Sequence, residues 1–143
     1  MILHYLKKKE NKDKDLANII YRDIVKATKN IANIDLKIKN TDFNITFEVV
    51  CILLSCFFVK YDKTNDKSKI LNQYIMDLFI KDLDHSLRLM GIDMNLGKYV
   101  KKYVKKFYFR LSELEVIFKE IDQNKFKEYL VKYKLLNSFE EIK

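Results

Sequence analysis

Residues 96–121 read LGKYVKKYVKKFYFRLSELEVIFKEI, and their apolar residues recur at intervals of three or four positions. At 100° per residue this spacing predicts one long amphipathic helix with an apolar stripe about 100° wide. Other helices have to cover a stripe of that width, so the segment favours an all-α fold. The stripe comprises Leu96, Val100, Tyr103, Val104, Phe107, Leu111, Leu114, Phe118 and Ile121.

The rest of the chain contains four further helical patterns. Residues 15–31 place apolar side chains, among them Leu16 and Ile19, along one side of a helix. Residues 47–61 are apolar on nearly every side, which is typical of the central helix of a bundle. A helix is also expected over residues 69–90, whereas residues 34–38 alternate and are expected to form an extended connection. The patterns predict an all-α, single compact helical bundle domain of about five helices.

Helix ends are inferred from capping residues, because the chain has no proline and two glycines. Gly91 follows the helix over residues 69–90 and suits the left-handed conformation that closes helices. Asn95 is placed to cap the helix over residues 96–120, and Asp122 to cap a fifth helix. The lysine-rich residues 1–14 are expected to be a poorly ordered N-terminal segment, which leaves residues 15–143 as the helical domain.

Two cysteines and one apolar run bear on the class of protein. Cys51 and Cys56 lie five positions apart, which suits neither a disulfide within a helix nor a zinc site, so both are expected to be buried hydrophobic side chains. The longest apolar run covers residues 46–59 and contains Glu48, whereas a spanning helix needs about 20 apolar residues. Neither a transmembrane segment nor a signal peptide is expected.

The positive charge is concentrated on the long amphipathic helix. The chain has a net charge of +8, and residues 96–110 contribute six positive side chains and no acid. Helical winding places Phe109 among these lysines, and an exposed aromatic side chain surrounded by cations is typical of a contact site. The candidate partner-binding residues are therefore Lys98, Lys101, Lys102, Lys105, Lys106, Tyr108, Phe109 and Arg110.

One carboxylate lies on an apolar face of the preceding helix. Asp82 winds onto the same side as Leu78 and Leu89, where an unpaired carboxylate would cost several kcal/mol. Arg110 is the expected partner and the Tyr108 hydroxyl is the second choice, unless Asp82 lies at the edge of the stripe near water. Asp84 and Arg88 are four positions apart and are expected to form a surface pair.

The sequence offers little for catalysis. His4 and His85 have no companions at a spacing that suits a nucleophile or a metal site, and no phosphate-binding glycine loop exists. Asp82 and Asp84 are two positions apart, so a helix directs them to different faces. We expect no catalytic residue, no metal ligand, no cofactor and no small-molecule substrate, and therefore a protein that is not an enzyme.

The stretch DLDHSLRLMGIDMNLGKYVKKYVKKFYFRL, residues 82–111, resembles the signature of the ubiquinol-cytochrome c chaperone family. That signature has an acidic pair, then SLREMGVGD, then LSVGK with a basic run, and it closes on FYGR. FEVVCILL, residues 47–54, also resembles the family's central apolar helix, whereas Leu89 and Phe109 depart from the signature. The matching residues are Asp82, Asp84, Ser86, Leu87, Arg88, Met90, Gly91, Gly97, Lys98, Phe107, Tyr108 and Arg110.

The resemblance implies an assembly chaperone for the cytochrome bc1 complex that binds newly made cytochrome b or an assembly partner through a basic helix face. It also implies a bacterial member acting in the cytoplasm or peripherally at the inner membrane. Asp82, Asp84, Arg88, Gly91, Gly97 and Phe107 are then expected to have structural roles. The ribosome and anionic membrane lipids are further candidate partners. The alternative is a basic helical domain that binds nucleic acid or the ribosome and has no role in bc1 assembly.

Overall fold

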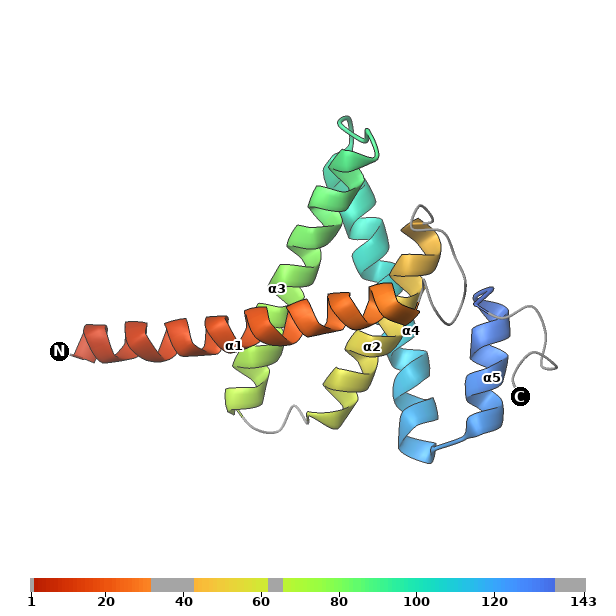
Figure 1. Cartoon of the computed structure of the whole chain (residues 1–143), viewed down its shortest axis with the longest axis horizontal. Helices are drawn as coiled ribbons and strands as arrows, with labels where there is room; N and C mark the ends of the chain where they lie inside the picture. Colours follow the sequence, from red (N-terminus) through yellow and green to blue (C-terminus); the bar gives the residue numbers. More distant parts are fainter. Residues whose placement is uncertain (1, 32–42, 62–65, 136–143) are drawn as a thin grey trace. The chain divides into compact units, whose positions relative to one another are not determined.

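The computed structural model describes residues 2–31, 43–61 and 66–135, and the regular structure within them is helical (Figure 1). This confirms the all-α fold with five helices. The residues expected to form an extended connection, 34–38, lie outside the described part of the chain. The helices are α1 (Ile2–Asn30), α2 (Phe43–Lys60), α3 (Asp66–Leu89), α4 (Leu96–Glu120) and α5 (Gln123–Lys132).

Helix α1 is longer than the sequence pattern predicts. It begins at Ile2, whereas the apolar spacing places its start near residue 15. Lysine, glutamate and leucine favour helix, and no proline or glycine interrupts residues 2–30, so nothing local ends the helix before its amphipathic part. The predicted division of the chain after residue 14 stays a prediction.

The contacts among the helices group into two compact units. Unit 1 comprises Met1–Asp23 and Tyr61–Lys106, and unit 2 comprises Ile24–Lys60 and Phe107–Lys143. Helices α1 and α4 therefore contribute residues to both units.

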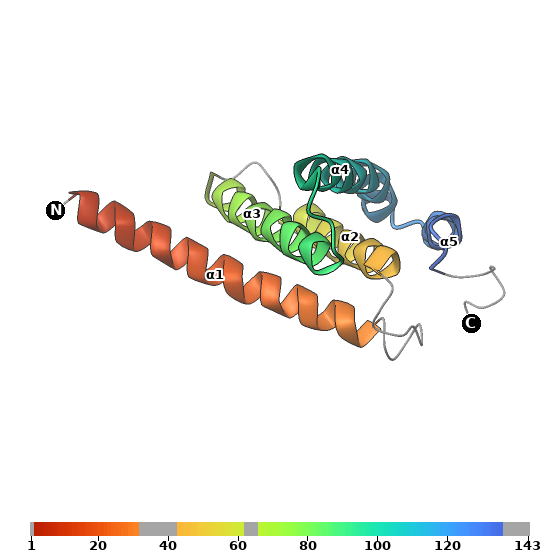
Figure 2. The same ribbon diagram turned by 90° about the horizontal axis from the view of Figure 1, so that it is seen from above.

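In unit 1, α1 crosses α3 (Figures 1 and 2). The buried apolar residues of α1 are Ala17 and Tyr21, whereas Leu16 and Ile19 are exposed, contrary to the predicted stripe. The small Ala17 side chain allows the helices to approach closely at the crossing. The buried face of α1 is therefore the one that contains Ala17, and apolar spacing alone does not identify it. Leu89 is also exposed, because the buried row of α3 consists of Ile75, Met76, Phe79, Leu83 and Leu87.

In unit 2, α2 and α5 cover the C-terminal half of α4. Leu114 and Ile117 of α4 and Tyr129 of α5 form a buried cluster against which Phe118 and Phe126 pack. The predicted core position of Ile121 is wrong, since its side chain is 82% exposed and Ile117 is buried in its place. Helix α4 ends at Glu120, so the helical spacing that predicted a core position for Ile121 does not extend to this residue. Buried apolar residues of α2 are Phe47, Val49, Cys51, Leu54 and Phe58.

Three helices close with the same hydrogen-bond pattern. After α3, Ile92 N–H donates to the Leu87 carbonyl at 3.1 Å, and Gly91 between them has φ +88°. Asp122 N–H donates in the same way to Ile117 after α4, and Leu135 N–H to Leu130 after α5. This is the Schellman closure, which places one residue in the left-handed region. The expected role of Gly91 is confirmed, but the corresponding residues after α4 and α5 are Ile121 and Lys134.

The predicted helix starts also agree with the structure. Asp122 precedes α5, and its carboxylate accepts hydrogen bonds from the backbone N–H of Asn124 and Lys125. Asn95 precedes α4 as predicted, but its φ is +62° and its backbone carbonyl, rather than its side chain, is the acceptor for Lys98 and Tyr99 N–H.

Candidate functional site

Four exposed lysines of α4 lie together in unit 1 and form what we call the lysine cluster: Lys98, Lys101, Lys102 and Lys105. They line a hollow of about 500 Å³ together with Asn95 and Tyr99, and no acidic side chain of the described residues lines it. The amphipathic pattern of α4 explains their position, since Val100 and Val104 are turned towards the interior and are partly buried. Lys106 differs, because it is half-buried with its Nζ 5.0 Å from the Tyr103 ring centroid.

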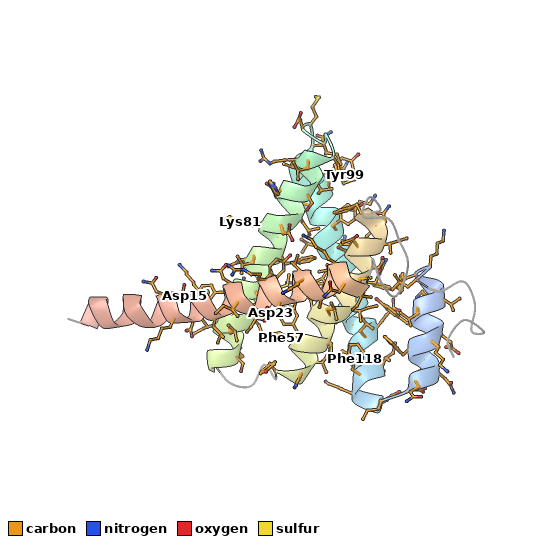
Figure 3. All side chains as sticks on the ribbon, viewed as in Figure 1. Asp15, Asp23, Phe57, Lys81, Tyr99 and Phe118 are labelled. Carbon is orange, nitrogen blue, oxygen red and sulfur yellow. The ribbon has the colours of Figure 1, made fainter. Side chains whose placement is uncertain are left out.

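A larger groove of about 890 Å³ is also part of unit 1. Its lining is mostly apolar and comes from α1, α3 and the start of α4. Lys101 lines both this groove and the lysine hollow, so the two are adjacent. Figure 3 labels Lys81 on α3, which lines the groove, and Tyr99 on α4, which lines the hollow.

Gly97 lines the groove at the first turn of α4. A Cβ atom built there would have no atom within 4 Å, and the backbone of Gly97 does not require a positive φ. Neither packing nor backbone conformation within the described residues therefore accounts for a glycine at this position. The missing side chain leaves the α4 backbone accessible from the groove.

Asp82 is partnered, but not by the predicted residue. Its Oδ2 accepts a hydrogen bond from the Tyr21 hydroxyl at 2.6 Å, and its Oδ1 accepts one from Ser86 at 3.4 Å. Burial raises the pKa of the Tyr21 hydroxyl, and the neighbouring Asp82 carboxylate raises it further. The predicted Arg110 partner is wrong, since Asp82 belongs to unit 1 and the guanidinium of Arg110 is bound within unit 2.

In unit 2, Arg110 forms a two-pronged ion pair with Glu48 of α2. Its Nε lies 3.0 Å from Glu48 Oε2 and its Nη2 lies 3.0 Å from Oε1, and both side chains are only 13% exposed. The guanidinium also lies 3.8 Å from the Tyr133 ring centroid. Burial acts to lower the pKa of Arg110, but the hydrogen bonds and charge of Glu48 outweigh it and the net shift is upward. Arg110 therefore has little surface to offer a partner.

Glu48 and Tyr133 are the residues that sequence reasoning missed. Glu48 is the one acid in the apolar run over residues 46–59, and a carboxylate in such a run needs a buried cation. That signal was present, although it does not identify which cation pairs with Glu48. Tyr133 donates a hydrogen bond to Glu113, and Lys132 lies 3.3 Å from the same carboxylate.

The two aromatic candidates of unit 2 are both exposed, which was predicted for Phe109. Tyr108 is 51% exposed and Phe109 is 59% exposed, with Lys132 Nζ 6.0 Å from the Phe109 ring centroid. Phe107 of α4 is fully buried and packs edge-on against Phe58 of α2, which agrees with a structural role. The predicted surface pair is also present in unit 1, with Arg88 Nε 3.0 Å from Asp84 Oδ2.

The described residues contain no group of three or more His, Cys, Asp or Glu side chains that could hold a metal ion. Cys51 is buried, and burial raises the pKa of its thiol. Cys56 is exposed, so its predicted burial is wrong, because this part of α2 buries Leu54, Ser55 and Phe58 and leaves Cys56 towards solvent. In the described part of the chain, α2 is the one helix whose length and composition would allow it to span a membrane.

Comparisons with known proteins found one similar solved structure and one matching family model. The chain resembles a solved structure, the crystal structure of the Cbp3 homolog from Brucella abortus, with a TM-score of 0.79 and 24% sequence identity. The similarity covers 93% of this chain and 74% of that chain, and it supports the fold. No match was found among curated proteins. The family model described as ubiquinol-cytochrome C chaperone matches residues 35–138 and includes both the Glu48–Arg110 pair and the lysine cluster, so this chain belongs to that family.

Proposed function

We propose that this chain is an assembly chaperone for the cytochrome bc1 complex that binds newly made cytochrome b, or a protein that assembles with it, through unit 1. Family membership supports a role in the assembly of ubiquinol-cytochrome c reductase. The observation that carries the binding proposal is the junction at Lys101, where a mostly apolar groove of about 890 Å³ meets a hollow lined by lysines. A polypeptide segment can place apolar side chains in such a groove and acidic groups over the hollow.

The lysine cluster and the groove have different tasks in this proposal. Positive charge at the cluster attracts an acidic partner and orients it as it approaches, and this effect weakens as salt concentration rises. Affinity comes from apolar contacts in the groove, where Gly97 allows the partner to approach the α4 backbone closely. Within unit 2, Tyr108 and Phe109 are exposed aromatic side chains of the kind that contact protein partners.

The test reverses the charge of the cluster. The triple variant Lys101→Glu, Lys102→Glu and Lys105→Glu changes exposed side chains and should keep the helical circular dichroism of the wild type. We expect less assembled bc1 complex on native gels of membranes and less cytochrome b recovered with the tagged chain. The matched control is the triple variant Lys12→Glu, Lys26→Glu and Lys29→Glu, which changes net charge equally at exposed positions of α1.

Each outcome of this test is informative. Normal assembly in the cluster variant would exclude the lysine cluster as the binding surface. An equal loss in both variants would show that net charge, rather than this surface, is required. If the wild-type chain recovers RNA instead of cytochrome b, and the recovery falls steeply with salt, the nucleic-acid alternative is correct and the bc1 proposal fails.

A further inference from the structure

The turn between α3 and α4 presents three large apolar side chains to solvent. Leu89, Met90 and Met94 are 75%, 54% and 85% exposed, and we call them the apolar tip. Backbone hydrogen bonds order the start of this turn, with Met90 N–H donating to Ser86 and Gly91 N–H to Arg88. Leu89 and Met90 are therefore exposed at an ordered helix end, and with Met94 they form a concentration of exposed apolar surface that marks a contact site.

Positive charge lies directly beside the apolar tip. Residues 89–105 contain four lysines, all in the lysine cluster, and Asp93 as the one acid. Arg88 does not add to this charge, because it pairs with Asp84. Tyr99, which is 40% exposed, lies within the hollow that the four lysines line. The apolar tip is thus followed along α4 by a hollow that four lysines line together with Tyr99.

This order of side chains matches the order of chemical groups at the surface of an anionic lipid bilayer. Flexible methionine and leucine side chains suit the region where acyl chains begin, and tyrosine favours the interface. Lysines extend their charged groups towards headgroup phosphates while their methylene stems stay close to the apolar region. The hollow of about 500 Å³ provides space for such phosphate groups next to the lysine ammonium groups.

We propose that the α3–α4 turn is a membrane-docking element: the apolar tip inserts into an anionic bilayer, and the lysine cluster holds lipid phosphates at its surface. Helix α4 keeps its apolar stripe inside the protein in this arrangement, because insertion uses only side chains that are already exposed. The lysine cluster is also part of the client surface proposed above, so lipid and client would occupy it in turn. Purified chain and lipid alone test the lipid contact without the client.

A tryptophan at the tip reports insertion directly, because the chain contains no tryptophan of its own. The Met94→Trp variant changes a highly exposed side chain in a turn and should fold as the wild type does. With vesicles of phosphatidylcholine mixed with phosphatidylglycerol, we expect its fluorescence to shift to shorter wavelength and to be protected from iodide quenching. Vesicles of phosphatidylcholine alone should produce a much smaller shift. The matched control is Val116→Trp in unit 2, which starts half exposed and should not shift.

Removing parts of the surface should weaken vesicle binding measured by co-sedimentation. Met94→Ser should lower the partition coefficient roughly fivefold or more, whereas Val116→Ser should leave it unchanged. Lys98→Gln combined with Lys102→Gln should lower it roughly tenfold and reduce its salt dependence.

Several results would overturn the proposal. No shift of Met94→Trp with anionic vesicles at low salt would exclude insertion, and an equal shift of Val116→Trp would show that the tip is not the inserted part. A shift of Met94→Trp on adding solubilised cytochrome b, without any shift on adding vesicles, would assign the tip to a protein partner instead.

Discussion

Arg110 of α4 and Glu48 of α2 form a two-pronged ion pair, with Arg110 Nε 3.0 Å from Glu48 Oε2 and both side chains 13% exposed. The pair joins the two segments that carry the sequence resemblance in unit 2, FEVVCILL and FYFR. Tyr133 covers the guanidinium from one side, which adds a cation–π contact. The arginine of the closing motif therefore stabilises the fold of unit 2, whereas the lysines that precede it in the chain belong to the exposed surface of unit 1.

Glu48→Ala should lower the free energy of unfolding by about 3 kcal/mol, because it leaves a largely buried guanidinium without its carboxylate. Arg110→Lys should cause a smaller loss, since lysine keeps the charge but cannot reproduce the two-pronged geometry or the contact with Tyr133. Urea denaturation followed by far-UV circular dichroism measures both. The surface pair Arg88 and Asp84 is the control, and Asp84→Ala should cost less than about 1 kcal/mol. Equal losses for Glu48→Ala and Asp84→Ala would contradict this prediction.

The helix ends after α3 and α4 predict opposite effects of two substitutions. Gly91→Ala should destabilise the protein by about 1 kcal/mol, because residues with a Cβ atom disfavour a φ of +88°. The loss should not be larger, since no neighbouring atom lies within 4 Å of the new methyl group. Ile121→Gly should stabilise it by roughly 1 kcal/mol, because a β-branched residue at φ +50° is strained and its side chain is exposed. Thermal unfolding of the two variants beside the wild type measures both changes. Destabilisation by Ile121→Gly would show that its side chain makes a contact that outweighs the strain.

Gly97→Ala should leave stability unchanged or raise it by up to about 1 kcal/mol, because the new methyl group meets no atom within 4 Å and alanine favours helix. The same variant should reduce recovery of cytochrome b, since the methyl group projects into the groove that we propose for the client. Measuring the melting temperature and the recovery on the same preparation separates the two effects. A stable variant with unchanged recovery would show that the partner does not approach the backbone at Gly97.

The Tyr21–Asp82 hydrogen bond predicts a loss of stability at alkaline pH. Burial, followed by the interaction with Asp82, raises the pKa of Tyr21 in the folded chain above its ordinary value of 10.0. Between pH 10 and the pKa of Tyr21 in the folded chain, the unfolded chain binds fewer protons than the folded chain does. The free energy of unfolding therefore decreases as pH rises in this range. The stabilisation is complete below about pH 10 and is lost as pH rises through the folded pKa.

Tyr21→Phe tests this relationship. It should lower stability by about 2 kcal/mol at neutral pH, because Asp82 loses its shorter hydrogen bond. It should also make the decrease above about pH 10 less steep, since one fewer buried tyrosine ionises on unfolding. Urea denaturation at a series of pH values measures both effects. If the variant and the wild type lose stability with the same slope, the shift of Tyr21 is not the cause.

Several features of the structure follow from residues close together in the chain. The all-α fold, the start of α4 after Asn95, the cap at Asp122 and the left-handed Gly91 were all predictable from the sequence. Each depends on the periodicity of one helix or on hydrogen bonds within one turn, which a single stretch of sequence specifies. The exposure of the lysine cluster was predictable for the same reason, since one amphipathic helix determines which of its sides faces solvent.

What the sequence alone determined is therefore the set of helices, most of their ends and the charged side of α4. Only the tertiary structure decided that Glu48 pairs with Arg110, that Tyr21 binds Asp82 and that a groove meets the lysine hollow at Lys101. These features join residues from different helices, and helical periodicity does not specify which helices become neighbours or how closely they approach. Packing of whole side-chain surfaces selects those neighbours, so the partners of a buried charge emerge only when the helices are assembled.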